Sequence, residues 1–532
     1  MNLNKNGIKN RLSIGATSHG QNRGSGAASP ANGKKPGITV FSGGTAANSL
    51  VNVFNRIVEE RGCPLNYVIP ISDNGGSSSE LIRVIGGPSV GDIRSRLVRL
   101  IPTRENDDDW ENDEEMSALR TLFEYRLPDQ PDAARLEWLD IVESRHLLWS
   151  FVSSPKRELI RSVLNTVNLE IVKRARPNSV FNFAKASIGN LFLTGARLFS
   201  GSLESAIYLL SVICSIPPSV SVLPAINSNF THHISAGLAD GSTITGQVNI
   251  SHPSAPTALP DNQLIAPALT AADHDRIEDA NLPGSLPVLR RPHIAFSKHD
   301  DEDLPARIER LWYINPYGHE IWPVANVKVL DALHASATVV YSIGSLFTSI
   351  LPSLILRGVG TAIARPGVRH KVLVLNSKLD RETGPCSDPM TAMDFVVAVA
   401  RAAGTDGAAS EGDDAARRVD VARFVTHLLY LEGEGTPAVD VGELGGLGVK
   451  CVKVAGRWVG EGKAAMLRYE PKALREAICE INYGWYPQQI DVLGFMSPSP
   501  RAIYHIRRPV WKVILIIDYA GLGPTDILWF LT

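Results

Sequence analysis

The chain has 532 residues, 44% of them apolar, and its formal net charge of −2 gives it no excess of positive charge that would draw it to nucleic acid or to an acidic membrane. Its five cysteines are widely separated and form no CxxC pair, which argues against a structural zinc site and a disulfide framework. Because no run of about eighteen apolar residues occurs, the sequence predicts no transmembrane helix, and we expect a cytoplasmic protein.

The first 36 residues are rich in Asn, Ser and Gly and contain no acidic residue. This composition predicts a disordered tail, with a mitochondrial transit peptide as the alternative. From residue 37 to residue 101 the chain alternates between short apolar runs, at 37–41 and 67–71, and helix-like segments. Glycine-rich turns follow both runs. This succession of strand, glycine turn and helix predicts an α/β fold.

A long insertion is predicted at 102–180. Residues 102–117 carry many acidic side chains, which we interpret as a solvated face, with a divalent-metal site as the weaker alternative. An amphipathic helical pattern fills 118–176.

Regular elements follow this insertion. They are helices at 186–199, 203–214 and 325–335, and strands at 220–223, 233–238, 243–248, 338–343 and 371–376. The Asp240-Gly241 pair predicts a hairpin between the second and third of these strands. Residues 251–303 are rich in Pro, Ala and Asp without periodicity, which indicates a second, exposed insertion.

Composition also divides the C-terminal part of the chain. A Gly/Ala/Asp-rich linker at 404–418 separates the α/β domain, 37–403, from a helical or mixed extension at 419–482. Helices are expected at 421–431 and 472–481 within the extension. Residues 483–532 have poor periodicity and are expected to form an irregular tail.

Three glycine turns in the first hundred residues form a candidate phosphate site. Glycine lets the backbone approach a ligand, and the N–H groups at a helix start point toward an anion. A carboxylate there can hold a metal or a ribose hydroxyl, and an arginine can neutralise phosphate charge. The residues with these predicted roles are Gly43, Gly44 and Thr45 in the first turn, Asp73, Asn74, Gly75, Gly76 and Ser77 in the second, and Gly91, Asp92 and Arg94 in the third.

Each of these turns also has a structural interpretation. Asp73 and Asn74 can form an Asx turn, Ser77 and Glu80 match a capping box, and Asp92 can cap its own helix.

Candidate binding residues also occur further along the chain. Gly189 and Asn190 lie at a helix start, and Gly344, Ser345 and Thr348 follow a predicted strand. Asn376 ends another predicted strand, where closing a turn is its equally weighted alternative. No G-x-S-x-G nucleophile motif occurs.

Together these motifs resemble the CofD-like family of 2-phospho-L-lactate transferases and their relatives, the YvcK-like gluconeogenesis factors. The matching features are the G-G-T turn, the D-N-G-G-S-S turn, the P-x-x-G-D-I-R helix start, the S-x-G-N-L segment, the hairpin at 238–248, the G-S-L-F-T-S-I-L-P run, and Asn376 with the following Glu382-Thr383. The resemblance covers 37–100, 182–250 and 307–403. The chain departs from the usual pattern at Ala46, where glycine is frequent, and at Asn74, where aspartate is usual.

The resemblance implies a Rossmann-like parallel sheet flanked by helices, with a small antiparallel hairpin element and long insertions. In the transferase branch, a phospholactyl group moves from a guanosine-diphosphate-linked donor to a deazaflavin with Mg²⁺. The other branch is regulatory and binds a uridine-diphosphate sugar. By this resemblance Asp73, Asp92 and Arg94 are expected to act in catalysis, and Asp73 with Asn74 or Asp92 to hold Mg²⁺. The expected partner is a small GDP- or UDP-linked conjugate, with a homodimer as an open alternative to a monomer.

Overall fold

The computed structural model describes residues 35–44, 46–72, 75–102, 110–175, 180–253, 285–290, 292, 302–405, 420–460, 465–483, 501–507 and 512–518. The chain divides after Asn482 into two compact units, which are described separately.

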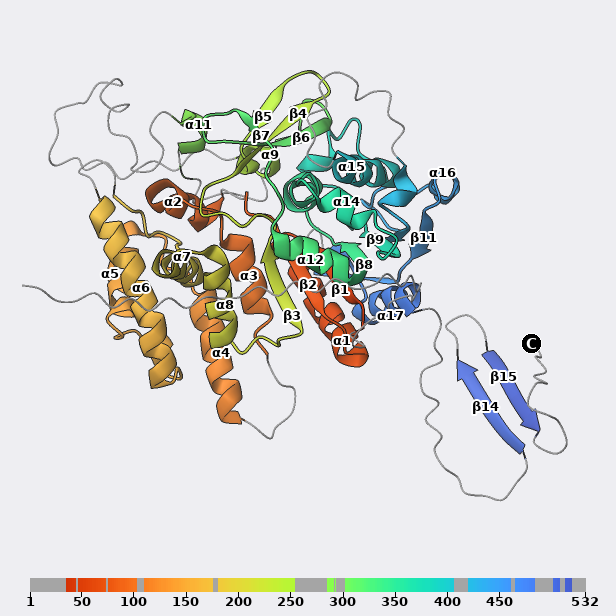
Figure 1. Ribbon diagram of the computed structural model, residues 1–532, viewed down its shortest axis with the longest axis horizontal. Helices are drawn as coiled ribbons and strands as arrows, with labels where there is room; N and C mark the ends of the chain where they lie inside the picture. The colour runs from red at the N-terminus through yellow and green to blue at the C-terminus, as the bar shows by residue number, and fades with distance from the viewer. Residues whose placement is uncertain are drawn as a thin grey trace, which may run out of the picture. The chain divides into compact units, whose positions relative to one another are not determined.

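The core of the first unit is a parallel sheet of seven strands in the order β3-β2-β1-β8-β9-β10-β11 (Figure 1). Its strands are β1 Gly37–Phe41, β2 Leu65–Ile69, β3 Val220–Pro224, β8 Ser336–Tyr341, β9 His370–Val374, β10 His427–Tyr430 and β11 Lys450–Lys453. All five residues of β1 are buried, as expected for a strand covered on both faces. The predicted Rossmann-like sheet is confirmed. The strand order reverses between β1 and β8, and ligands of such sheets bind outside the carboxyl ends of the strands at this reversal.

A layer of helices connects β2 to β3 and lies together on one side of the molecule in Figure 1. These helices are α2 Gly76–Ile85, α3 Gly91–Arg99, α4 Trp110–Glu124, α5 Pro131–Val142, η2 Leu147–Trp149, α6 Ser154–Arg174, α7 Ile188–Ser200 and α8 Leu203–Ile213. Helix α7 lies at the centre, since its residues 188–197 are all buried. A Cβ on Gly195 would lie 2.5 Å from the Val163 carbonyl oxygen, so glycine permits α6 and α7 to pack closely.

The predicted insertion at 102–180 therefore contributes to the core and is not only a solvated excursion. Trp138 of α5 and Trp149 of η2 are among the largest fully buried side chains. The acidic run lies partly outside the described residues. Its described end includes Glu115, whose carboxylate pairs with Lys156 at 2.8 Å.

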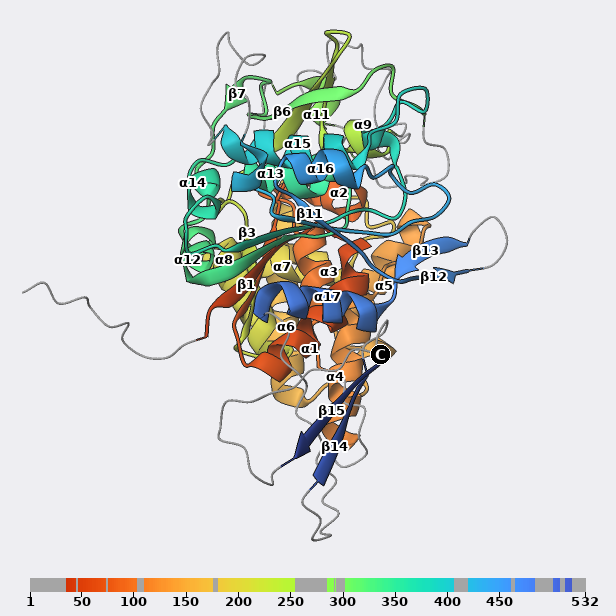
Figure 2. The same cartoon turned by 90° about the vertical axis from the view of Figure 1, so that its right-hand side faces the viewer.

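Further helices connect the other strands of the sheet (Figure 2). The connecting helices are η1 Ala46–Leu50 and α1 Val51–Arg61 after β1, then α12 Val327–Ala335, η3 Leu346–Ile350, α13 Leu351–Leu354, α14 Val359–Ile363, η4 Arg381–Thr383, α15 Ala392–Gly404, η5 Val421–Arg423, α16 Val441–Gly446 and α17 Pro471–Tyr483. The helix expected at 472–481 is confirmed as α17.

The helix predicted at 421–431 is wrong. A short η5 occupies its start, and β10 pairs in parallel with both β9 and β11. Leu428 and Leu429 are fully buried there, one on each face of the sheet. A short apolar run fits a buried strand as well as a buried helix, and only its neighbours in the sheet decide between them.

A small antiparallel sheet in the order β5-β4-β6-β7 forms a second element. Its strands are β4 His233–Leu238, β5 Thr243–Thr245, β6 Ile308–Ile314 and β7 Glu320–Ile321. The hairpin predicted at Asp240-Gly241 is confirmed. The strand expected at 243–248 ends early, because Gly246 turns at φ 91° into α9 Gln247–Ser251. The described residues after α9 include the short helix α11 Pro287–Arg290.

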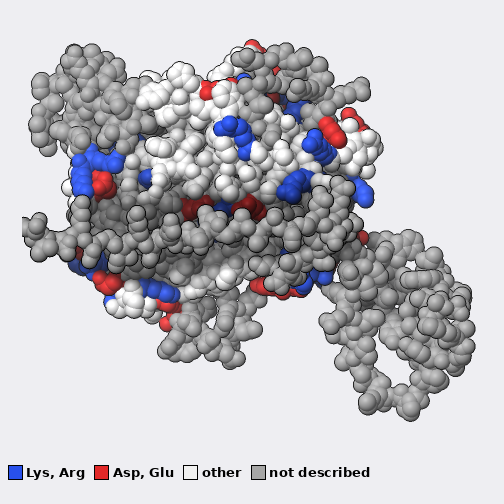
Figure 3. Space-filling model, viewed as in Figure 1, with Lys and Arg blue, Asp and Glu red and all other residues white. Residues whose placement is uncertain are grey.

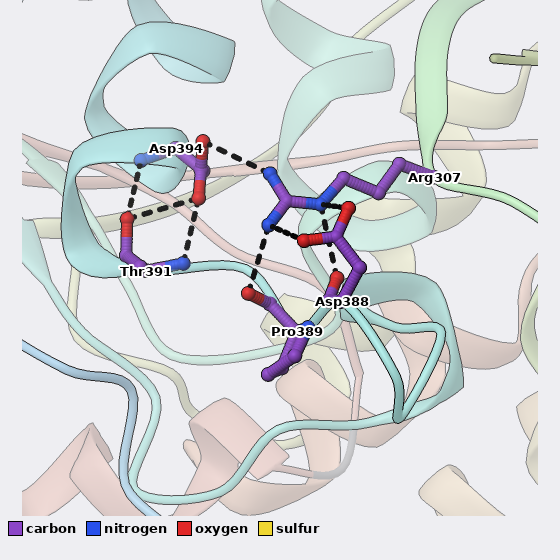
Figure 4. Close-up of polar contacts among 5 residues, drawn as sticks. All are labelled: Arg307, Asp388, Pro389, Thr391 and Asp394. Atoms are coloured by element: carbon purple, nitrogen blue, oxygen red, sulfur yellow. Dashed lines mark hydrogen bonds and ion pairs between the residues drawn. The ribbon is translucent and has the colours of Figure 1, made fainter.

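Arg307, just before β6, fastens this small sheet to the start of α15 (Figure 4). Its Nη2 donates to Asp388 Oδ1 at 2.7 Å and to the Pro389 carbonyl at 2.9 Å. Its Nη1 lies 3.2 Å from Asp394 Oδ1, and Asp394 also forms the capping box of α15 with Thr391. The small sheet is thus tied to a fixed point of the main domain.

Two further hairpins complete the described chain. Strands β12 Gly456–Val459 and β13 Met466–Tyr469 belong to the first unit. In the second unit β14 Arg501–Arg507 pairs with β15 Lys512–Asp518, where the sequence indicated only irregular structure.

Among the described helices, none has the length and apolar character needed to span a membrane. On the face shown in Figure 3, the basic and acidic side chains of the described residues lie in small separate groups.

Candidate functional site

A pocket of about 260 Å³ lies where the fold places it, outside the carboxyl ends of β1 and β8. It is lined by the turns after these strands, by the starts of α2, α3 and α9, and by side chains from α7 and the end of α4. The lining residues are Gly43, Gly44, Ala46, Ala47, Gly75, Gly76, Ser77, Ser78, Gly91, Asp92, Arg94, Ser95, Arg126, Asn190, Gln247, Val248, Ser251, His252, Gly344, Ser345, Thr348 and Ser349.

The structure therefore brings together most of the predicted site. Three predicted residues, Thr45, Asp73 and Asn74, lie outside the described residues, so the structure says nothing of their roles. Two others, Gly189 and Asn376, are described but do not line the pocket.

The turn after β1 needs its glycines for close packing. A Cβ on Gly43 would lie 2.5 Å from Ser349 Cβ, and one on Gly44 would lie 1.9 Å from Asp92 Oδ1. In the described part of the chain, no protein acceptor takes the N–H groups of Gly43 or Gly44. Both residues line the pocket, and their amides are not committed to another part of the described protein.

Arg96 supports this turn from behind. Its side chain is 1% exposed and lies 4.4 Å from the centre of the Tyr67 ring. Its guanidinium donates to Ser42 Oγ at 3.2 Å and to the Ala47 carbonyl at 3.4 Å. Burial lowers the pKa of Arg96, as it does for a cation placed away from water. Arg96 is not among the residues that the sequence predicted for the site.

The starts of α2 and α3 face the pocket without a side-chain cap hydrogen bond. The backbone amides at such a helix start carry partial positive charge and suit an anion. The capping box expected from Ser77 and Glu80 is wrong. Glu80 instead forms a buried ion pair with Arg83 at 2.6 Å, and Ser77 Oγ accepts from Asn190 Nδ2 at 3.0 Å.

Two arginines form the cationic wall of the pocket. Arg94 Nε donates to Asn190 Oδ1 at 3.3 Å, which holds the guanidinium toward the cavity. Burial, and then the nearby Arg126, lower the pKa of Arg94 to about 10. Arg126 Nη1 donates to the Lys185 carbonyl at 3.2 Å, and burial lowers its pKa as well. No sequence motif surrounds Arg126, so only the fold reveals it.

Gly189 contributes to the site by leaving space for the Arg94 side chain. A Cβ there would lie 2.6 Å from Arg94 Cγ and 2.5 Å from the Phe123 carbonyl oxygen. The glycine thus leaves room for the arginine stem between α3 and α7.

The turn after β8 differs from the turn after β1, because its backbone amides donate hydrogen bonds to other side chains of the protein. The Gly344 N–H donates to Asn376 Oδ1 at 3.0 Å, and Asn376 Nδ2 donates to the Gly344 carbonyl at 2.8 Å. The amides of Phe347 and Thr348 both donate to Glu382 Oε2, at 2.8 and 3.0 Å, and the Thr348 hydroxyl donates to the other carboxylate oxygen. Three amides of this turn, and the Thr348 hydroxyl, are therefore already committed to the protein. Asn376 has the turn-closing role that was its alternative.

Glu382 lies 1% exposed behind this turn, close to Asp380. Burial, and then the neighbouring Asp380, raise the pKa of Glu382 to about 8, although the Thr348 and Phe347 hydrogen bonds oppose this. Burial also raises the pKa of Asp380.

Among the described residues that line the pocket, Asp92 is the carboxylate. It suits a magnesium ion that is also held by the phosphate oxygens of a bound ligand. Mg²⁺ is commonly held by one or two carboxylates together with phosphate oxygens of the ligand. Within the described ranges no group of three or more His, Cys, Asp or Glu side chains is suited to hold a metal by protein ligands alone. Of the two predicted metal ligands, Asp92 lines the pocket and Asp73 lies outside the described residues.

Comparisons with known proteins agree with this fold. A family model described as 2-phospho-L-lactate transferase CofD matches residues 38–434. The uncharacterized protein YNL011C of Saccharomyces cerevisiae is 40% identical over 418 residues, which are 74% of this chain and 90% of the yeast protein. Two crystal structures of BH3568, a UPF0052 family member from Bacillus halodurans, match with TM-scores of 0.50 and 0.51 at 18% identity, covering 84% of this chain and 100% of the bacterial chain. At this identity the structural match concerns the fold alone.

Proposed function

This chain belongs to the CofD family, and from that membership we propose that it binds a nucleoside-diphosphate conjugate in the pocket between β1 and β8. We propose further that, with Mg²⁺, it transfers a phospholactyl-type group from that conjugate. The family description, which names a transferase, supports the second part.

One observation carries the binding proposal. Gly43 and Gly44 leave their amides open beside two arginines, Arg94 and Arg126, in a single pocket at the strand-order reversal. A diphosphate presents several acceptor oxygens and a double negative charge, and this arrangement supplies both backbone donors and forked cationic donors.

The chain's own contribution to transfer would be positioning and charge stabilisation. The amides of the β1 turn and the start of α2 would hold the diphosphate, and Arg94 and Arg126 would stabilise charge that develops on it. Asp92 would hold Mg²⁺ together with the bound phosphates, and the metal would supply further neutralisation of their charge.

A regulatory protein that binds a uridine-diphosphate sugar without turnover is the second candidate. The observation that favours it is Asn74, which stands where the family pattern has an aspartate, so that the second glycine turn carries one carboxylate fewer for a metal.

The test is a ligand panel on the full chain, measured by thermal unfolding and calorimetry. The ligands are GDP, UDP and UDP-N-acetylglucosamine, each with and without Mg²⁺. A ligand at about 100 times its Kd should stabilise the protein by roughly 2.7 kcal/mol. A Mg²⁺-dependent response to GDP, and not to the uridine ligands, supports the transferase. A response to the uridine sugar without turnover supports the regulator, and no response to any ligand contradicts the binding proposal.

Arg94→Gln is the variant that ties the response to the pocket. Loss of a charged hydrogen bond is worth about 1.5–3 kcal/mol, so affinity should fall roughly 10- to 100-fold. Arg99→Gln is the matched control, because Arg99 is on the same helix α3 but does not line the pocket. Equal losses in the two variants would mean that overall charge, and not this site, governs binding.

A further inference from the structure

A second group of basic residues, two histidines and a lysine, lies at the opposite, amino edge of the parallel sheet. His370, His427 and Lys450 are the first residues of β9, β10 and β11. The pocket described above lies at the carboxyl edge, so the two groups are separated by the length of the strands.

The strand register places these three side chains on one face of the sheet. His427 pairs with Lys450 on one side and with Val372 on the other. Paired residues point to the same face, and so do residues two apart in a strand, which adds His370 to the same row. The imidazole rings of His370 and His427 have centroids 5.9 Å apart and are tilted by 56°.

The electrostatic surroundings of the two rings are cationic. The charged groups that act on His370 are Arg369, Lys371 and Lys450, and those that act on His427 are His370 and Lys450. Asp420, the acidic residue nearby, acts on Lys371. In the described part of the chain, none of Arg369, Lys371 and Lys450 takes part in an ion pair.

Burial lowers the pKa of His370, and burial together with His370 and Lys450 lowers that of His427 to about 4. The Nδ1 atom of His370 is buried without a hydrogen-bond partner. Such an atom in a folded protein usually has a water or an ion beside it. The row therefore places Lys450 beside two imidazole rings that are neutral in the free protein and can gain a proton when an anion binds.

We propose that His370, His427 and Lys450 form a second anion site that binds a small phosphate-bearing molecule at the amino edge of the sheet. A phosphate group carries up to two negative charges and three acceptor oxygens that point in different directions. It can therefore accept from two tilted imidazole rings and an ammonium group at once. This site is independent of the nucleotide pocket.

Binding of an anion here takes up protons. A negative charge beside the rings favours their protonated form and raises both pKa values above those of the free protein. Affinity should therefore increase as the pH falls through the raised pKa of the complex toward the lower pKa of the free protein.

The experiment follows the imidazole proton signals of the full-length protein by NMR, with His370→Gln and His427→Gln used to assign them. Pyrophosphate, inorganic phosphate and a simple phosphate monoester are titrated separately at constant ionic strength with chloride. We expect saturable shifts of both signals, with tighter binding at pH 6 than at pH 8. The probe that binds most tightly distinguishes free phosphate from an organic ester as the ligand.

Lys450→Gln and Lys453→Gln form the matched pair of variants. Both remove one exposed charge from β11, but Lys453 points to the other face and pairs with Glu432. Lys450→Gln should weaken binding by about three- to five-fold, as expected for loss of a charge pair worth up to about 1 kcal/mol, and Lys453→Gln should leave it unchanged. Absence of saturable shifts, or equal weakening by both variants, would overturn the proposal. Arg94→Gln should not move these signals, which separates this site from the pocket.

Discussion

Two glycine turns at adjacent strands, after β1 and after β8, look alike in the sequence and differ in the structure. Both follow a buried strand and precede a helix. The Gly43 and Gly44 amides of the first have no protein acceptor in the described part of the chain. Those of Gly344, Phe347 and Thr348 in the second are taken by Asn376 and Glu382. A glycine turn suits an anion only where the rest of the fold leaves its amides unused.

The largest expected effect concerns the carboxylate that fills the β8 turn. Glu382→Leu leaves two buried amides and a hydroxyl without their acceptor, each costing about 1–3 kcal/mol. The free energy of unfolding, measured by chemical denaturation, should fall by about 3–5 kcal/mol. Glu382→Gln keeps an acceptor oxygen for the amides and should cost much less. Similar losses in both variants would mean that the carboxylate does not act as the acceptor for this turn.

Gly43→Ala tests the turn after β1. Its Cβ would lie 2.5 Å from Ser349 Cβ and 3.2 Å from Ser349 Cα, so the β1 and β8 turns must separate. We expect a loss of about 1–3 kcal/mol in stability, as for overpacking, and weaker ligand binding. Gly367→Ala is the control, because a Cβ there has open space around it. Denaturation and calorimetry on both variants measure the effects, and unchanged binding by Gly43→Ala would argue against the β1 turn as the anion cradle.

The stability of the protein should depend on pH because the pKa of Glu382 is raised in the folded state. Its folded pKa of about 8 is raised above the ordinary value of 4.5, so the folded protein keeps a proton that the unfolded chain releases between these values. This contribution to stability is complete below pH 4.5 and is lost as the pH rises toward 8, at up to about 1.4 kcal/mol per pH unit. Denaturation at a series of pH values should show this slope in the parent and a flatter one in Glu382→Gln. Equal slopes would contradict the raised pKa.

The smallest expected effect is that of Asn376→Ala. It removes two hydrogen bonds to Gly344, worth about 1 kcal/mol each, so stability should fall by roughly 1–2 kcal/mol. Because Asn376 lies outside the pocket, ligand affinity measured by calorimetry should stay within about two-fold, a free-energy change well below 1 kcal/mol. A much larger loss of affinity would show that the β8 turn also holds the ligand.

Much of this fold could be predicted from local patterns. Apolar runs followed by glycine turns indicated the strands β1 and β2, and family motifs indicated the parallel sheet. Gly43, Arg94, Asn190 and Ser345 were all identified as site residues and all line the pocket. The prediction of a helix in place of β10 was wrong because four residues carry too little periodicity to identify a strand.

Other parts of the site depend on contacts between distant segments. Arg126 and His252 line the pocket from segments that carry no recognisable motif, and Arg96 supports the β1 turn through contacts 49 and 54 residues apart in sequence. The sequence by itself determined the strand–turn–helix units and the residues at their ends, since backbone preference and apolar periodicity are local properties. Only the tertiary structure decided which amides remain open, which arginines share one wall and which carboxylate is protonated, because hydrogen-bond partners and burial are set by chain segments far apart in sequence.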